Sequence, residues 1–376
     1  MAGLSVPQGG YCRNLMDRSS LPRANQNSYM TGMHDASHSD ESPLHSGYAM
    51  PAEWAPHRRT WMCWPCRSEA WGSEARLERA RLATVRVARA IAQFEPVVIV
   101  ARPADAAMVE RACRGFAEIL VVPLDDSWAR DTGPTFLSGL GIAGVAWQFN
   151  AWGGKYDGYE HDRAFASRIL LHEHGKAFCA PIVCEGGAIH VDGEGTLITT
   201  EQCLLNPNRN PGVARQQISE TLRRYTGAET VLWLPGEYSD RETDGHVDNI
   251  ACFAAPGRII IGTPPADHPD FTAIADLKRF LAEAHDARGR RLEIVELVQP
   301  HRLRDDWRGR PLAASYVNFY LANGGLVMPA FDDPADLPAQ RVLKDCFPDR
   351  EIVQLDALDI VQGGGGIHCI TQQEPL

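Results

Sequence analysis

Short apolar segments alternate with helix-length amphipathic segments along the chain from about residue 47. Residues 75–94 have helical periodicity, and Ser73 can cap the start of this predicted helix. A buried strand is predicted at 96–100, a second helix from Pro103 and another strand at 118–123. The apolar positions of the first helix are Leu77, Leu82, Val85, Ala88 and Ile91. This alternation predicts an α/β protein.

The remaining chain repeats one order of elements: a β-hairpin, a helix and an apolar strand. The first hairpin surrounds the Gly-Leu-Gly turn at 139–141, and three more are predicted at 186–200, 246–262 and 315–329. The predicted helices are 162–174, 211–225, 270–285 and 334–347, and the strands after them are 177–183, 229–234, 292–297 and 351–355. Residues 366–373 begin a last hairpin strand whose partner must lie elsewhere.

These repeats predict four units and a fifth one divided between 58–65 and the C-terminal segment. At roughly 65 residues per unit, the pattern favours a single radial, propeller-like domain over 46–376. Residues 1–45 are rich in polar residues and lack the apolar core of a secretory signal. We interpret them as a disordered extension or an over-extended gene start.

Candidate catalytic residues recur at equivalent places in the units. Asp131, Glu185, His246 with Asp248, and Cys369 each fall just before or on the first strand of a hairpin. If the units are related by rotation, these side chains converge on one axis. Cys369 follows four glycines, 363–366, which permit close backbone approach and leave room beside the thiol.

Composition restricts the partners. A net charge of -11 and a pI of about 5.6 argue against nucleic acid, and no apolar run approaches the roughly 20 residues that span a bilayer. The ten cysteines are unevenly spaced and are expected to be reduced thiols, which places the protein in the cytoplasm.

A thiol, an imidazole and several carboxylates suit a cationic guanidino substrate. Carboxylates bind the planar guanidinium through paired N–H···O bonds, which fixes its central carbon for attack by a thiolate. Metal catalysis is less favoured, because only His246 and Asp248 are close in sequence. Cys63 and Cys66 have the spacing of a thiol-disulfide motif, but the thioredoxin context is missing.

Several motifs, in order, resemble the agmatine deiminase family of the guanidino-group-modifying superfamily. The resemblance covers about residues 44–376 and its motifs are highly specific as a series. The matching segments lie at 50–54 (MPAEW), 60–65 (TWMCWP), 126–134 (DSWARDTGP), 149–154 (FNAWGG), 185–193 (EGGAIHVDG), 245–249 (GHVDN) and 363–375.

This resemblance implies a five-bladed, pseudo-symmetric ββαβ propeller of the pentein type that needs no metal or organic cofactor. Cys369 would be the nucleophile and His246 the general acid/base. Asp131 and Asp248 would hold the guanidinium, and Glu185 would complete the carboxylate set. Trp128 would pack near the bound cation, and Gly366 is a further substrate-binding candidate. Agmatine and water would give N-carbamoylputrescine and ammonia through a covalent S-amidino intermediate, within putrescine and polyamine metabolism.

Ser46 departs from the family pattern, which carries an acidic residue at this position. Amine recognition would then need another group, for which Glu53 is a candidate. Three alternatives remain: a deiminase of peptidyl-arginine, a thiol-redox or metal-binding protein built around Cys63 and Cys66, and a polyamine binder without turnover. Relatives are often oligomeric, so a homodimer or higher homo-oligomer is expected.

Overall fold

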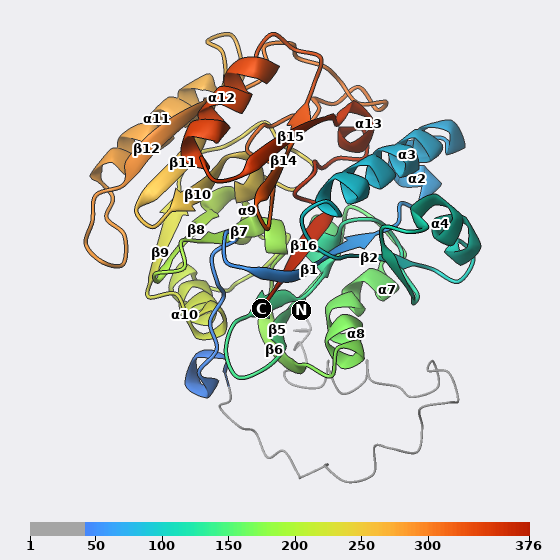
Figure 1. The fold of residues 1–376 in the computed structure, drawn as a ribbon. Coiled ribbons are helices and arrows are strands. Elements are labelled where there is room, and N and C mark those ends of the chain that lie inside the picture. The colour runs from blue at the N-terminus through green and yellow to red at the C-terminus, as the bar shows by residue number, and fades with distance from the viewer. Residues whose placement is uncertain (1–41) are drawn as a thin grey trace, which may run out of the picture.

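The computed structural model describes residues 42–376, which contain five separate β-sheets (Figure 1). The prediction for 1–45 falls almost entirely outside the described residues. Of its last four residues, Leu44 and His45 belong to the short 3₁₀ helix η3 (Leu44–Ser46).

Four of the sheets are formed by consecutive segments, as the hairpin pattern predicted. In each, a short antiparallel pair is followed by a parallel partner. The strands are β4 (Thr135–Leu137), β5 (Ala143–Gln148) and β6 (Lys176–Val183); β7 (Ile189–Val191), β8 (Thr196–Thr200) and β9 (Thr230–Leu234); β10 (Ala251–Ala255), β11 (Arg258–Thr263) and β12 (Glu293–Val298); and β13 (Tyr320–Ala322), β14 (Gly325–Ala330) and β15 (Glu351–Asp356).

The remaining sheet joins the two ends of the folded region. Its order is β16 (Thr371–Pro375), β1 (His57–Cys63), β2 (Val97–Ala101) and β3 (Glu118–Val121). β16 runs antiparallel to β1, with Trp61 opposite Gln372. The Trp61 indole N–H also donates to Glu374 at 2.9 Å, which ties the last strand to β1. The predicted division of the fifth unit is therefore confirmed.

Helices cross over between the parallel strands, as such pairs require. Figure 1 shows them around the outside of the molecule, with the strands nearer its centre. The longer ones are α3 (Glu74–Ile91), α4 (Ala106–Cys113), α8 (Phe165–His172), α10 (Arg215–Thr226), α11 (Phe271–Glu283) and α12 (Asp336–Cys346). The short ones are α2 (Ser68–Trp71), α5 (Ala129–Thr132), α6 (Ala151–Gly154), α7 (Glu160–Arg163), α9 (Glu201–Leu204), α13 (Leu358–Val361), η4 (Gly186–Ala188) and η5 (Val247–Asn249).

In the first long helix, α3, the predicted N-cap is confirmed, but one of the predicted buried positions is exposed. The Arg76 N–H donates to Ser73 Oγ at 3.3 Å, as expected for an N-cap. Leu82, placed on the buried stripe by the periodicity, is 54% exposed. Leu77, Ala88 and Ile91 are buried as predicted, and the small residues Ala80 and Ala83 face the core as well.

Within the described part of the chain, no helix is long and apolar enough to cross a bilayer. Eight cysteines there are free thiols, and all eight are buried.

Candidate active site

The predicted site residues lie together at the strand starts. Asp131 lies in α5 before β4, Glu185 precedes η4 and β7, and His246 and Asp248 lie at η5 before β10. Cys369 lies two residues before β16. All five are buried. They lie just before the first strands of four different sheets, and His246 and Asp248 share one of these positions.

Gly187 marks the point where three of these side chains meet. A Cβ atom there would lie 2.8 Å from Asp131 Oδ1, 2.8 Å from His246 Nδ1 and 2.9 Å from Asp248 Oδ2. Its backbone N–H donates to Asp131 Oδ1 at 3.0 Å. Any side chain at Gly187 would therefore push these three side chains apart, which explains why this position is glycine.

The Cys369 thiol faces carboxylate and amide groups. Its sulfur lies 3.5 Å from Asp248 Oδ2 and 3.2 Å from Asn318 Nδ2. Burial raises the pKa of Cys369 well above its usual value, and the negative charges of Asp248 and Asp131 raise it further. The neutral thiol is favoured in the empty site, and a cation placed among the same groups would favour the thiolate.

The His246 ring lies between two carboxylates. Nδ1 is 3.7 Å from Asp131 Oδ1, and Nε2 is 3.6 Å from Glu185 Oε2. Burial lowers the pKa of His246, but Asp131, with Cys203 and Glu185, raises it well above its usual value. The imidazolium is therefore favoured at neutral pH, and it carries a proton that can be given to a leaving group.

The pKa values of Asp131 and Asp248, the two carboxylates that face the thiol, are shifted in opposite directions. Burial raises the pKa of Asp131, while the Trp152 indole N–H donates to its Oδ2 at 2.8 Å. Burial also acts on Asp248, but His368, whose Nδ1 lies 3.0 Å from Oδ2, brings the net pKa below its usual value. Asp248 is therefore the more firmly ionised of the pair.

Arg209 supports Glu185 and was not predicted from the sequence. Its Nε donates to Glu185 Oε1 at 2.7 Å, and its Nη1 lies 2.8 Å from Asp244 Oδ2. Although burial alone would raise the pKa of Glu185, Arg209 and His246 lower it. Arg209 lies in the connection between α9 and α10, where no periodicity singled it out.

Asn318 was also missed, although its position could have revealed it. It lies before β13 and so occupies the fifth strand start, in the hairpin for which no candidate was named. It carries no titratable group, and the search for acids, imidazoles and thiols passed over it. Its contact with Cys369 completes the set, because every sheet now provides a residue at the site.

An aromatic pocket leads to Cys369. Trp128 lies in its lining and is 5% exposed; its ring stacks on Trp71 with centroids 5.9 Å apart. Trp152 has a positive φ of 53°, a costly conformation for a non-glycine residue, which directs its indole toward Asp131. The other lining aromatics are Phe149, Tyr156 and Tyr159.

Gly365 and Gly366 leave space for different neighbours of the thiol. A Cβ at Gly365 would lie 2.6 Å from the Trp128 ring and 3.0 Å from Cys369 Cβ, as the expectation of room beside the thiol requires. A Cβ at Gly366 would lie 2.3 Å from Asn318 Oδ1. Gly366 is not among the residues that line the pocket, and its role in substrate binding stays a prediction.

Neither Ser46 nor Glu53 lies in the lining of this pocket. The Glu53 carboxylate lies 2.8 Å from His368 Nε2 and 3.2 Å from Arg130 Nη1. Burial opposes its ionisation, but these cations lower the pKa of Glu53 well below its usual value. Glu53 is a buried structural counter-charge. Glu242 does line the pocket, and its Oε2 lies 2.7 Å from Arg310 Nη1.

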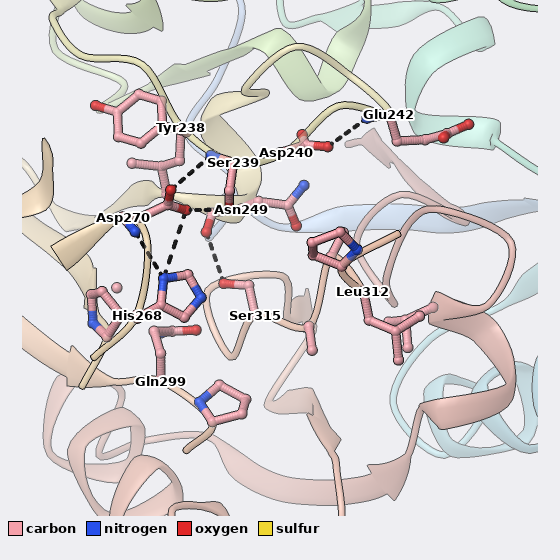
Figure 2. A pocket seen from close by; sticks show the side chains of 18 of the residues that line it. Tyr238, Ser239, Asp240, Glu242, Asn249, His268, Asp270, Gln299, Leu312 and Ser315 are labelled. Carbon is pink, nitrogen blue, oxygen red and sulfur yellow. Dashed lines mark hydrogen bonds and ion pairs between the residues drawn. The ribbon is translucent and has the colours of Figure 1, made fainter. Parts of the chain in front are cut away.

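Figure 2 shows a second pocket, which shares Glu242 with the lining of the aromatic pocket. Its polar groups are largely paired with one another. Ser239 Oγ donates to Asp270 Oδ2 at 2.9 Å, and Ser315 Oγ donates to the Asn249 carbonyl at 2.8 Å. These bonds hold the loops that precede β10 and β13, and they thereby support the site.

The alternative chemistry at Cys63 and Cys66 finds no support. Burial raises the pKa of both thiols, as it does for Cys369, but Cys63 and Cys66 line neither pocket, and the Cys66 thiol donates to the Asp125 carbonyl at 3.1 Å. One set of described side chains could hold a metal ion, namely Glu185, Cys203 and His246, whose donor atoms lie within 4.8 Å of one another. A divalent cation there would have to compete with Arg209 and the imidazolium for the same carboxylate.

A repeated α/β fold with a buried thiol, an imidazole and carboxylates at its strand starts is what the resemblance to the guanidino-group-modifying superfamily implies. The comparisons agree: the model of the Porphyromonas-type peptidyl-arginine deiminase family matches residues 49–375. The chain belongs to this family, and the resemblance found in its motifs is confirmed.

Its relatives include proteins named agmatine deiminase. One from Stutzerimonas stutzeri is 43% identical over 362 residues, covering 89% of this chain and 97% of the relative. One from Pseudomonas aeruginosa is 42% identical over 364 residues, with the same coverage. The solved structure of an agmatine deiminase of Enterococcus faecalis superposes with a TM-score of 0.83 at 35% identity, covering 89% of this chain and 97% of that one.

Proposed function

We propose that this protein hydrolyses agmatine to N-carbamoylputrescine and ammonia. The observation that carries the proposal is the Cys369 sulfur, buried 3.5 Å from the Asp248 carboxylate at the end of an aromatic pocket. Such a site can neutralise and orient a guanidinium. The agmatine deiminase names of the relatives support the choice of substrate.

The proposed reaction begins when the guanidinium binds between Asp131 and Asp248. Its charge stabilises the Cys369 thiolate, whose proton leaves the site. The sulfur attacks the central carbon and forms the C–S bond; His246 then gives its proton to one nitrogen, the C–N bond breaks and ammonia departs. The product of this half-reaction is a cationic S-amidino intermediate.

Water completes the cycle. His246, now neutral, takes a proton from a water molecule that attacks the same carbon. The C–S bond breaks, the thiolate is restored, and the ureido product passes its extra proton to solvent. In this scheme Glu185 and Asp131 favour the imidazolium, and Trp128 presents an aromatic face to the substrate cation.

Glu242 is the proposed partner of the distal amine of agmatine. Of the carboxylates that line the pocket, Asp126 and Asp162 are 4% and 3% exposed and are held by protein donors. Glu242 is more accessible, with its side chain 12% exposed, and it accepts a hydrogen bond from the Tyr156 hydroxyl. It is also paired with Arg310 at 2.7 Å, so the amine would share this carboxylate with the arginine. A carboxylate at this place would compensate for Ser46, where the family pattern carries an acid.

We further propose that the five sheets are the blades of a closed propeller around this site, within one catalytic domain over 46–376. Each sheet brings a residue to the thiol from its strand start, which favours a radial arrangement. A cytoplasmic homo-oligomer that supplies putrescine synthesis and requires no cofactor is consistent with this proposal.

The test is release of ammonia and ureido product from purified protein offered agmatine, free arginine and an arginine-containing peptide in parallel. Turnover of agmatine alone supports the proposal, and Cys369→Ala is the control for background hydrolysis. Turnover of the peptide instead would move the substrate to peptidyl-arginine. Agmatine binding without ammonia release would make the protein a polyamine binder.

A further inference from the structure

Asn318 is held so firmly that its amide can have only one orientation. Its Oδ1 accepts the His368 backbone N–H at 2.9 Å. Its Nδ2 donates to Asn249 Oδ1 at 3.0 Å. These two bonds distinguish the oxygen from the nitrogen of the amide, because an N–H can only donate and the Asn249 oxygen can only accept.

The second proton on Nδ2 is directed at the nucleophile. Nδ2 lies 3.2 Å from Cys369 Sγ and 3.4 Å from the Asp248 carbonyl oxygen, while Asn318 Oδ1 is farther from the sulfur, at 3.6 Å. Asn318 is fully buried, so bulk water does not compete for this proton. The missing side chain of Gly366 leaves the space that the Asn318 carboxamide fills.

The surroundings of the sulfur otherwise oppose a negative charge. Asp248 and Asp131 face it, while the imidazole rings of His246 and His368 contact those carboxylates. The groups that favour the thiolate by donating hydrogen bonds are the Gly366 backbone N–H and the Asn318 amide. These two donors can stabilise a thiolate in the way that backbone and side-chain N–H groups stabilise an oxyanion.

We propose that Asn318 is a further catalytic residue, whose side-chain N–H donates to the Cys369 sulfur in its thiolate form. The role rests on the proposed function, because it serves the attack on the guanidinium carbon. The amide also fixes the direction of the sulfur, because Asn249 and His368 anchor both of its ends. Asn249 acts through Asn318 and is a positioning residue.

Two variants test the donor. Asn318→Ala removes it, and Asn318→Asp keeps the size of the side chain but places an acceptor beside the sulfur. We expect kcat/KM for agmatine to fall about 10- to 100-fold in the alanine variant, the loss typical of one hydrogen bond to a charged group. The aspartate variant should lose more, because its carboxylate adds repulsion, and it covers the case in which the alanine variant does not fold.

The deciding measurement is the pH dependence of Cys369 alkylation by iodoacetamide, with the modified peptide identified by mass spectrometry. We expect the apparent pKa of Cys369 to rise by about one unit or more in both variants. Asn210→Ala is the matched control: Asn210 is also buried, and its Nδ2 donates to the Val183 carbonyl at 3.0 Å. This control should leave the alkylation profile unchanged.

A folded Asn318 variant with the wild-type alkylation profile and turnover would overturn the inference. Alkylation needs no substrate, so this result is separate from the test of the reaction. If wild-type protein does not hydrolyse agmatine but the variants shift the thiol profile, Asn318 keeps its role toward the sulfur and the proposed substrate is wrong.

Discussion

Glu185→Gln removes one of the two carboxylates beside the His246 ring and preserves the size of the side chain. The lost attraction acts over 3.6 Å. At an effective dielectric constant of about 20 it corresponds to about 4.6 kcal/mol, or roughly three pKa units. The positive charge of Arg209 is then no longer neutralised by Glu185. This charge disfavours the imidazolium and lowers the pKa of His246 further. Because Asp131 remains and the site can relax, we expect a decrease of at least about one unit.

The assay is the pH profile of kcat/KM for agmatine. Catalysis needs the imidazolium, so activity should fall on the alkaline side as His246 loses its proton, and this limb should move toward lower pH in the variant. The matched control is Glu95→Gln, since Glu95 forms a similar buried pair with His57 at 3.1 Å in another part of the fold. An alkaline limb that stays in place in folded Glu185→Gln protein would refute the role of Glu185.

Cys369→Ala should abolish turnover yet bind agmatine in calorimetry, since the carboxylates remain; turnover near wild type would remove Cys369 as the nucleophile. Glu242→Gln should raise KM for agmatine about tenfold with little change in kcat, the expected loss of one charge-assisted bond; an unchanged KM would exclude it as the amine partner. Cys63→Ser should keep turnover within a few-fold, and complete loss in folded protein would contradict its structural role. Glu53→Gln should lower the free energy of unfolding by about 3 kcal/mol at neutral pH, because buried cations lose their counter-charge. Since the pKa of Glu53 is lowered from 4.5, this advantage of wild type should vanish in denaturant titrations as pH falls below that value; a difference independent of pH would argue against the ion pairs.

The strand starts could be predicted because their signals are local. Turn residues such as Asp192-Gly193 locate the hairpins, and period-two or apolar runs locate the strands around them. Once the repeat is recognised, equivalent positions point to Asp131, Glu185 and Cys369 without any knowledge of distances. The structure brings these residues together as the repeat predicted.

The supporting residues could not be predicted in the same way. Arg209 acts through a contact with Glu185, 24 residues earlier, and stands in no pattern that marks a buried polar group. Asn318 does stand at a strand start, but it carries no titratable group, and only its contact with Cys369 shows its importance. Leu82 shows the opposite error: its spacing suggests burial, but close packing of α3 selects the alanine face. Periodicity describes what a helix can bury, while the neighbouring element decides what it does bury.

The pairing of β16 with β1 also determines the order in which the molecule can assemble. The four sheets made of consecutive segments contain mostly local pairings and can form while later segments are still being synthesised. The sheet beside the nucleophile is completed last, because β1 and β16, which pair with each other, lie at opposite ends of the folded chain. During refolding, activity should therefore return after most secondary structure has formed, so that a nascent or partly folded chain is unable to consume substrate.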